Sequence, residues 1–307
     1  MSEMTTTGSH RRTPTEPHPR TALAIGVTLL LWSSAFAAIK VGLRFYSPGE
    51  VALLRFGTAS LVLGFYALAT RMPLPARVDM GRIALAGFLG ITVYHVALNY
   101  GEQTVSAGAA SLIIAAAPVF TAGLASVFLG ERLSAWGWAG IAVAFAGVAM
   151  IAFGEGGDGM RLEPGAALIL LSAIVTAIYS ILSKPLLSRY RPLAFTTYVI
   201  WAGTLPMLVW APGLLLRLPT APLDSTLSVV YLGVFPAAIA YLFWSYALAR
   251  MSASALSTFL YLAPVSAILI AFVWIGEVPA PLALIGGVVA IAGVALTNTL
   301  GRRVLSS

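Results

Sequence analysis

The sequence predicts an all-α integral membrane protein with ten transmembrane helices, arranged as two inverted five-helix repeats around a central cavity. Of its 307 residues, 59% are hydrophobic and only 9% are charged, whereas a soluble domain carries roughly a quarter charged residues. Ten apolar stretches have about the 20 residues that a helix needs to cross the hydrocarbon of a bilayer. A sequence pattern near the end of the first half also recurs near the end of the second half, 146 positions later and without a gap. Pro118 and Pro264 are one pair of matching residues in this repeat.

The apolar stretches are predicted to be helices, because backbone groups in lipid must be hydrogen-bonded within their own segment. A charged residue or a Gly/Pro break separates each stretch from the next. The first is a retained span and not a signal peptide, because it has no small-residue cleavage site and ends at Lys40. The second is the weakest, because it contains Arg55. In chain order the stretches are 21–39, 51–70, 83–101, 103–130, 133–154, 164–183, 192–216, 225–249, 251–276 and 278–301.

The parts of the chain outside the spans are short. Residues 1–20 are polar and cannot bury enough apolar area to fold, so they are predicted to be a disordered cytoplasmic tail. The glycine-rich segment 154–164 is predicted to be an extracytoplasmic loop between the halves. The first repeat then covers 21–153 with helices 1–5, the second covers 165–301 with helices 6–10, and residues 302–307 form a second cytoplasmic tail.

The basic residues predict the orientation in the membrane. If the N-terminus is cytoplasmic, 13 of the 18 Lys and Arg residues lie in the tails and in the loops after helices 2, 4, 6 and 8. The positive-inside rule therefore places both termini in the cytoplasm of a multi-pass protein of the cell inner (plasma) membrane. Because five is odd, the second repeat runs upside down, so that Glu131 lies inside and its counterpart Glu277 lies outside.

An inverted repeat provides two nearly equivalent packings, one open to each side of the membrane, which is the structural basis of alternating access. The first helices of the two halves also correspond, since Lys40, Tyr46 and Pro48 match Lys184, Tyr190 and Pro192 at a spacing of 144. The alternative is a gene duplication that was kept only for stability.

Three motifs resemble the EamA family, the ten-helix branch of the drug/metabolite transporter superfamily. They are Trp32-Ser33-Ser34-Ala35-Phe36, Ala117-Pro118-Val119 followed by Gly130-Glu131, and Ala263-Pro264-Val265 followed by Gly276-Glu277. The resemblance covers about residues 21–300. It implies a basket of helices around a central cavity that exports small metabolites or amino acids, and the aromatic amino acid exporters are among the best-known members.

Helix 3 carries the sharpest polar cluster. His95, Asn99 and Glu102 lie at i, i+4 and i+7, which places them on one helical face, and Tyr94 flanks them. Polar side chains in lipid are costly unless they face a cavity or a partner, so this face is a candidate binding site. The alternative is that His95 and Asn99 hydrogen-bond a neighbouring helix and hold the bundle together. Glu102, at the helix end, is expected at the membrane interface.

Aromatic side chains accompanied by hydroxyl groups recur at helical spacing in helices 1, 6, 8 and 9. Such a lining suits an uncharged or zwitterionic cargo with apolar bulk, because aromatic faces stack on rings and attract an ammonium group. A strongly anionic cargo is disfavoured, because no Arg or Lys stands ready in mid-membrane unless Arg55 reaches the cavity. The remaining candidate binding residues are Trp32, Tyr179, Tyr241, Trp244, Tyr246 and Tyr261, with Ser254 and Thr258 beside Tyr261.

Pro118 and Pro264 are candidate hinges, one in each half. Each proline removes a backbone donor in mid-helix, where the helix can bend. A static kink is the alternative, since kinks are common in membrane helices.

These features predict a secondary transporter that exports small metabolites by alternating access, with aromatic or other bulky neutral amino acids as the leading cargo. Multidrug or other metabolite efflux is the alternative, and a membrane-embedded enzyme or a channel is disfavoured. No catalytic residue, metal site or cofactor is expected, because the chain has no cysteine and no phosphate-binding loop. His95 could carry a proton, but passive export is equally compatible. The expected partners are the bilayer and a small-molecule substrate, without nucleic acid, and the oligomeric state is left open.

Overall fold

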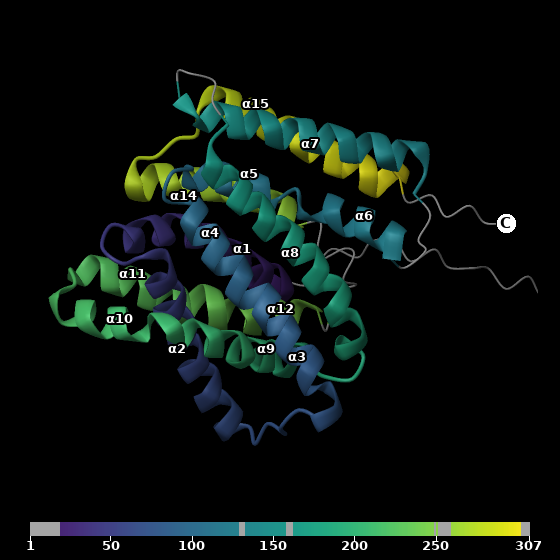
Figure 1. The fold of residues 1–307 in the computed structure, drawn as a ribbon. Coiled ribbons are helices and arrows are strands. Elements are labelled where there is room, and N and C mark those ends of the chain that lie inside the picture. The colour runs from purple at the N-terminus through teal and green to yellow at the C-terminus, as the bar shows by residue number, and fades with distance from the viewer. Residues whose placement is uncertain (1–18, 129–132, 158–161, 249, 251–258, 302–307) are drawn as a thin grey trace, which may run out of the picture.

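The computed structural model describes residues 19–128, 133–157, 162–248, 250 and 259–301, and within these ranges it is helical throughout, without a strand (Figure 1). Nine helical segments of this described part are long and apolar enough to cross a membrane, and Phe259–Ile275 is a shorter apolar one. The α-helices are α1 (Pro19–Leu43), α2 (Pro48–Ala69), α3 (Met80–Gly87), α4 (Tyr94–Gly101), α5 (Ala107–Ile114), α6 (Ala117–Phe128), α7 (Ala135–Glu155), α8 (Pro164–Leu187), α9 (Pro192–Met207), α10 (Ala211–Arg217), α11 (Leu223–Val234), α12 (Ala240–Leu248), α14 (Ala263–Ile275) and α15 (Pro281–Leu296).

Short 3₁₀ and π segments join several of these helices into single spans. The 3₁₀ turns are η1 (Arg77–Asp79), η4 (Leu208–Trp210), η5 (Leu218–Thr220) and η7 (Phe259–Leu262), and the π segments are η2 (Phe88–Val93), η6 (Phe235–Ile239) and η8 (Thr297–Gly301). Several predictions concern residues outside the described ranges: most of the tail 1–20, the tail 302–307, Gly130-Glu131, the second copy of the motif at 252–257, and Ser254 and Thr258.

Two of the predicted stretches are divided close to a proline. The stretch 103–130 divides into α5 and α6 at Ala115-Ala116, and Pro118 occupies the second position of α6, where its missing N–H leaves no helical bond unmade. The stretch 192–216 divides into α9 and α10 after Pro206. Stretch 83–101 is continuous but contains the π segment η2.

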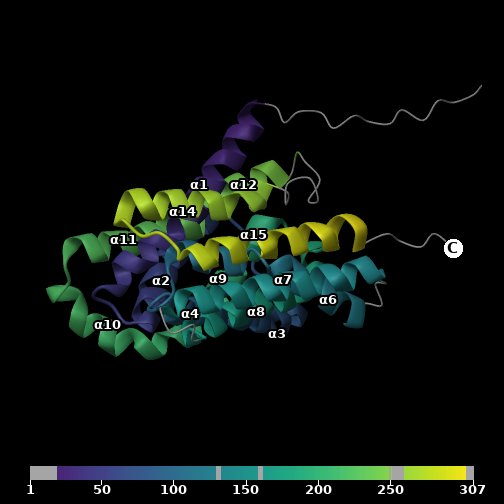
Figure 2. The same ribbon diagram turned by 90° about the horizontal axis from the view of Figure 1, so that it is seen from above.

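Helices α7 and α15 run side by side in both views (Figures 1 and 2). Their backbones touch through glycines: a Cβ added to Gly147 would lie 2.4 Å from the backbone N of Ala290, and one on Gly286 would lie 2.6 Å from the carbonyl of Gly147. Gly140 lies against Gly293 in the same way. The residue numbers rise along one helix as they fall along the other, so the pair is antiparallel, and its spacing is that of small-residue packing in membranes.

The outer surface of the bundle is apolar. Large hydrophobic side chains point outward from many helices, among them Leu68, Trp136 and Val273. So many exposed apolar side chains on a helical bundle indicate a surface that meets lipid. The buried core lies between α2, α4, α8 and α9, where Phe56, Ile169 and Ile200 are enclosed.

One end of the bundle is fixed by a buried carboxylate, and we call this the Asp79 end. Asp79 is 2% exposed and both of its oxygens have partners. The Arg189 guanidinium pairs with Oδ1, and the Tyr190 hydroxyl donates to Oδ2 at 2.7 Å while accepting from the backbone N of Ala76 at 3.0 Å. These contacts, the Asp79 anchor, connect the α2–α3 link to the α8–α9 link.

Candidate functional site

A buried cation lies in the centre of the bundle. Arg55, in α2, is only 6% exposed, its Nε has no hydrogen-bond partner, and within the part of the chain that the structure describes no carboxylate forms an ion pair with it. Its guanidinium lies 5.2 Å from the centre of the Phe56 ring, and the ionisable groups whose fields reach it are Tyr94, Tyr241 and Glu102. A guanidinium this deep in a membrane protein is costly without an anion, so Arg55 is the first functional candidate that the structure identifies.

An aromatic wall of Trp32, Tyr241 and Trp244 is linked to Arg55 through Tyr241, one of the groups whose fields reach the guanidinium. The Trp32 ring of α1 lies 5.4 Å from Tyr241 and 5.0 Å from Trp244, both in α12 (centroid to centroid). Trp32 also donates from Nε1 to the carbonyl of Pro236 at 3.1 Å. Pro236 lies in the π segment η6, where the regular backbone ladder is disturbed and carbonyls are available to side chains. The π segment of the eighth span therefore provides the carbonyl that holds the Trp32 ring in the wall.

The polar face of α4 is brought to the same place, but its members differ in their contacts. His95 is 8% exposed, its ring lies 4.4 Å from Phe56 and 4.5 Å from Tyr94, and its Nδ1 has no partner. Asn99 is fully buried and donates from Nδ2 to the carbonyl of Pro48 at 2.9 Å. Asn99 therefore connects α4 to the start of α2, which is the helix-joining role that the sequence left open.

The other predicted lining residues separate into two groups. Tyr179 stacks on Phe195 at 6.3 Å, and its electrostatic neighbour is Tyr241, so it lies on the margin of the cluster. Tyr246 instead lies under the Arg250 guanidinium, 3.5 Å from its ring centre. The Tyr261 hydroxyl accepts a hydrogen bond from Asn298 at 2.6 Å, and its ring packs beside α7 and α15. Among the described residues, no ring contact joins Tyr246 or Tyr261 to the Trp32, Tyr241 and Trp244 rings.

The two prolines occupy equivalent places. Pro118 and Pro264 are each the second residue of a new helix, α6 and α14, directly after a break. Beside the second break, the Ser33 hydroxyl of α1 donates to the carbonyl of Ala263 at 3.0 Å. Pro118 follows the two-residue gap at Ala115-Ala116, and Pro264 follows the change from the 3₁₀ turn η7 to α14. The role of both prolines as hinges stays a prediction.

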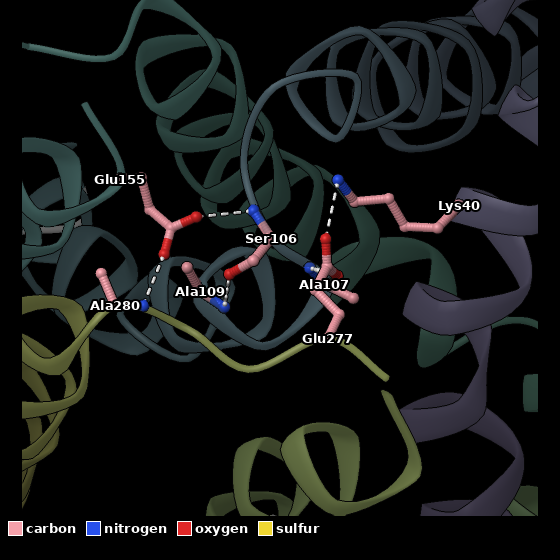
Figure 3. Close-up of polar contacts among 7 residues, drawn as sticks. All are labelled: Lys40, Ser106, Ala107, Ala109, Glu155, Glu277 and Ala280. Atoms are coloured by element: carbon pink, nitrogen blue, oxygen red, sulfur yellow. Dashed lines mark hydrogen bonds and ion pairs between the residues drawn. The ribbon is translucent and has the colours of Figure 1, made fainter. Parts of the chain in front are cut away.

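The end opposite Asp79 is held by two glutamates that the sequence analysis did not select (Figure 3). Glu277 pairs with Lys40 (Oε1 to Nζ, 3.2 Å) and accepts the backbone N–H of Ala107 on Oε2 at 2.7 Å. These contacts join the end of α1, the start of α5 and the segment between α14 and α15, and we call them the Glu277 latch.

Glu155 supplements the Glu277 latch at the same end. Its carboxylate accepts the backbone N–H of Ser106 at 2.7 Å and that of Ala280 at 3.2 Å (Figure 3). Carboxylates are favourable at helix starts, where backbone donors are unpaired and the helix dipole is positive. Glu155 therefore caps the N-terminal ends of both α5 and α15.

Glu102, which the sequence analysis expected at the membrane interface, is fully buried and interacts electrostatically with both members of the Lys40–Glu277 pair. It follows the Arg77–Gly101 span, is 0% exposed, and neither carboxylate oxygen has a hydrogen-bond partner. Burial raises the pKa of its carboxyl well above the usual value; the charge of Lys40 opposes the rise, Glu277 adds to it, and Arg55 opposes it. The sequence offered one signal, the position of Glu102 on the His95 face.

Two clefts open on the surface away from the aromatic wall. One of about 310 Å³ lies at the Glu277 end and is lined by polar and aromatic residues that include Arg44, Asp224 and Tyr231. The other, of about 340 Å³, is bounded mainly by apolar side chains of the third span and by Trp210. Neither cleft is lined by Arg55, His95 or a residue of the aromatic wall.

A helical bundle with an apolar exterior, a buried unpaired cation and carboxylates that close one end defines a multi-pass membrane transporter. Comparison with known proteins identifies the group. The EamA-like transporter family matches residues 20–153 and again residues 163–299, and the chain belongs to this family.

Similar proteins agree with this assignment. A protein of Streptantibioticus cattleyicolor named "Probable terminal-alkyne amino-acid exporter" is 46% identical over 282 residues, which are 91% of this chain and 94% of that protein. The uncharacterized transporter YdfC of Bacillus subtilis is 42% identical over 267 residues, 87% of each chain. A solved crystal structure shares the fold with a TM-score of 0.58 at 22% identity, covering 95% of this chain and all of the other.

Proposed function

We propose that this transporter exports zwitterionic amino acids with aromatic or other bulky neutral side chains by alternating access. The observation that carries the proposal is the buried, unpaired Arg55 guanidinium linked through Tyr241 to the aromatic wall of Trp32, Tyr241 and Trp244. The name of the Streptantibioticus relative, an amino-acid exporter, supports the same class of cargo.

Arg55 is the proposed partner of the cargo carboxylate. A guanidinium presents a planar fork of donors that fits a carboxylate with two parallel hydrogen bonds. The expectation that no mid-membrane cation is available is therefore revised. A single cation balances the one carboxylate of an amino acid, whereas a phosphorylated sugar or nucleotide sugar carries more negative charge than Arg55 can compensate.

The aromatic wall is the proposed partner of the remaining cargo atoms. Indole and phenol faces bind apolar bulk by stacking and attract an ammonium group through their negative faces. His95, with an unpartnered Nδ1, lies between Phe56 and Tyr94 and adds a polar contact. We assign Tyr94 and Tyr179 to the margin of the site, while the contacts of Asn99, Tyr246 and Tyr261 favour structural roles for these three.

Contacts between counterpart residues support an inverted ten-helix repeat, with repeats at 21–153 and 165–301. Ser60 and Thr204 are 144 positions apart and share a hydrogen bond at 3.0 Å, as expected for counterparts on a two-fold axis. Gly140 packs on Gly293 and Gly147 on Gly286, and the offset of 146 exchanges these two pairs. Such exchange is the property of a two-fold interface.

The orientation given by the basic residues puts both termini in the cytoplasm of the cell inner membrane and the Glu277 latch on the outer side. In this arrangement the latch closes the outer entrance, and breaks at Pro118 and Pro264 are the points where each half bends. Too few acid–base groups surround His95 for an enzyme, and a latched entrance is not compatible with a permanently open channel.

The test is counterflow in proteoliposomes, in which trapped unlabelled amino acid exchanges with external labelled amino acid. Phenylalanine, leucine and an alkyne-bearing amino acid should exchange, whereas glutamate and lysine should not. The variant Arg55→Ala should lose exchange, and Arg44→Ala, an exposed arginine, should retain it. Exchange of cationic dyes but not of amino acids would favour multidrug efflux instead.

A further inference from the structure

We propose that Glu102 is the proton-binding site of this transporter and that entry of a proton on Glu102 drives export of the amino acid. This inference rests on the proposed function. It supplies the coupling ion, for which the first helix provides no acid between Pro19 and Ile39.

The burial of Glu102 without partners is the first argument. The carboxylates of Asp79, Glu155 and Glu277 all accept hydrogen bonds or pair with cations, but both Glu102 oxygens have no partner at 0% exposure. An ionised carboxylate in that setting is strongly disfavoured, whereas a protonated one is tolerated. The latched structure therefore suits the protonated form of Glu102.

The charged groups around Glu102 connect it to the latch. Lys40 in α1 and Arg55 in α2 attract a negative charge at Glu102, and Glu277, before α15, repels it. On the elements nearby, Glu163 at the start of α8 and Glu155 at the end of α7 each accept backbone N–H groups. Lys40 therefore interacts with two carboxylates among the described residues, its present partner Glu277 and the unpartnered Glu102.

This competition gives protonation a mechanical effect. When Glu102 loses its proton, the new negative charge attracts Lys40 and repels Glu277, so the Lys40–Glu277 pair and the latch weaken. When water on the outer side transfers a proton to the carboxylate, the competition ends and the latch closes again. Cargo therefore leaves while Glu102 is ionised, and the proton returns inward on Glu102 and is released to water on the inner side.

The site is a feature of one half only. At the two repeat offsets of 144 and 146, the counterparts of Glu102 are Tyr246 and Leu248, neither of which is acidic. Arg55 likewise has Val199 as its counterpart at an offset of 144. A single carboxylate carries a single proton, so the expected stoichiometry is one proton for each amino acid.

The experiment uses proteoliposomes with an acidic lumen, the membrane potential clamped to zero, and a luminal pH dye. An amino acid that passes the counterflow test is supplied outside. With a gradient of one pH unit, one-to-one exchange accumulates it up to about tenfold in the lumen, because one pH unit corresponds to a tenfold equilibrium ratio. The dye should report proton loss that depends on the amino acid.

Glu102→Gln should abolish both accumulation and proton loss while retaining counterflow, which shows that the variant is folded. Glu102→Asp should retain coupling, and Asp224→Asn, an exposed acid, should behave as the unmodified protein. Accumulation by the unmodified protein without a pH gradient, accumulation driven by a sodium gradient, or coupled uptake by Glu102→Gln would overturn the proposal. Absence of amino-acid counterflow in the unmodified protein is a separate result and would overturn the proposed function together with this one.

Discussion

Asp79 and Glu102 are carboxylates buried at opposite ends of the third span, yet their surroundings differ completely. Asp79 has partners for both oxygens, whereas Glu102 has none. A fully hydrogen-bonded carboxylate holds its neighbours in place. A buried carboxylate without partners is stabilised when it binds a proton, which the protein itself does not supply. The buried guanidinium of Arg55 is stabilised in the same way when it binds an anion.

The largest effect is expected at Arg55, the other unpartnered charge. Hydrogen bonds to a charged group contribute about 1.5–3 kcal/mol, so Arg55→Ala should lower amino-acid counterflow roughly 10–100-fold. Arg55→Lys should recover only part of this, because an ammonium lacks the planar fork of donors. Initial rates over a range of cargo concentrations are the measurement. Normal transport by Arg55→Ala would remove Arg55 from the site.

The next effect is expected at the Asp79 anchor, and it should appear in stability. Asp79→Ala removes the acceptor of the Tyr190 hydroxyl and of Arg189. The Arg189 side chain is half exposed, so its share is small, and the loss should be about 2 kcal/mol. Thermal unfolding in detergent measures it, with Asp224→Ala as the exposed control. Glu102→Gln should leave the free energy of unfolding unchanged. A loss as large as that of Asp79→Ala would show that Glu102, like Asp79, stabilises the fold.

The smallest effect is expected at the latch. Glu277→Gln removes the charge that pairs with Lys40 but keeps an oxygen for the Ala107 N–H, so the closed state should lose about 1 kcal/mol, or roughly fivefold in population. A cysteine at Val105, a buried position beside the latch, should react about fivefold faster with an impermeant maleimide. The chain has no cysteine of its own, so labelling has no background. An unchanged rate would show that the Lys40–Glu277 pair does not control access.

The sequence was sufficient for the membrane class and the family, because composition, apolar length and the repeated Pro-Val and Gly-Glu motifs are local properties of the chain. It was also sufficient to select Trp32, Tyr241 and Trp244 as candidate binding residues, because helical spacing defines which residues share a face. It could not say which face meets which neighbour, and so it did not separate these residues from Tyr246 and Tyr261, whose partners Arg250 and Asn298 lie elsewhere.

Glu102 shows the same limit most clearly. A residue at the end of an apolar stretch is expected at the water interface, but α4 ends against the start of α8. A Cβ on Gly101 would lie 2.6 Å from the carbonyl of Gly165, so the two backbones touch and cover the next side chain. Only a glycine in each of two distant segments permits this approach, and no pattern within one segment reveals it.

The glycine contacts between α7 and α15 have a practical consequence for measurements of motion. Two helices whose backbones interlock cannot slide or rotate against each other without first separating, because each step would drive a carbonyl into the opposite chain. This pair should therefore move as one rigid unit during transport. Spectroscopic distances measured from α7 or α15 to α1 or α14 will record the transport movement itself, and distances between α7 and α15 should remain constant throughout the cycle.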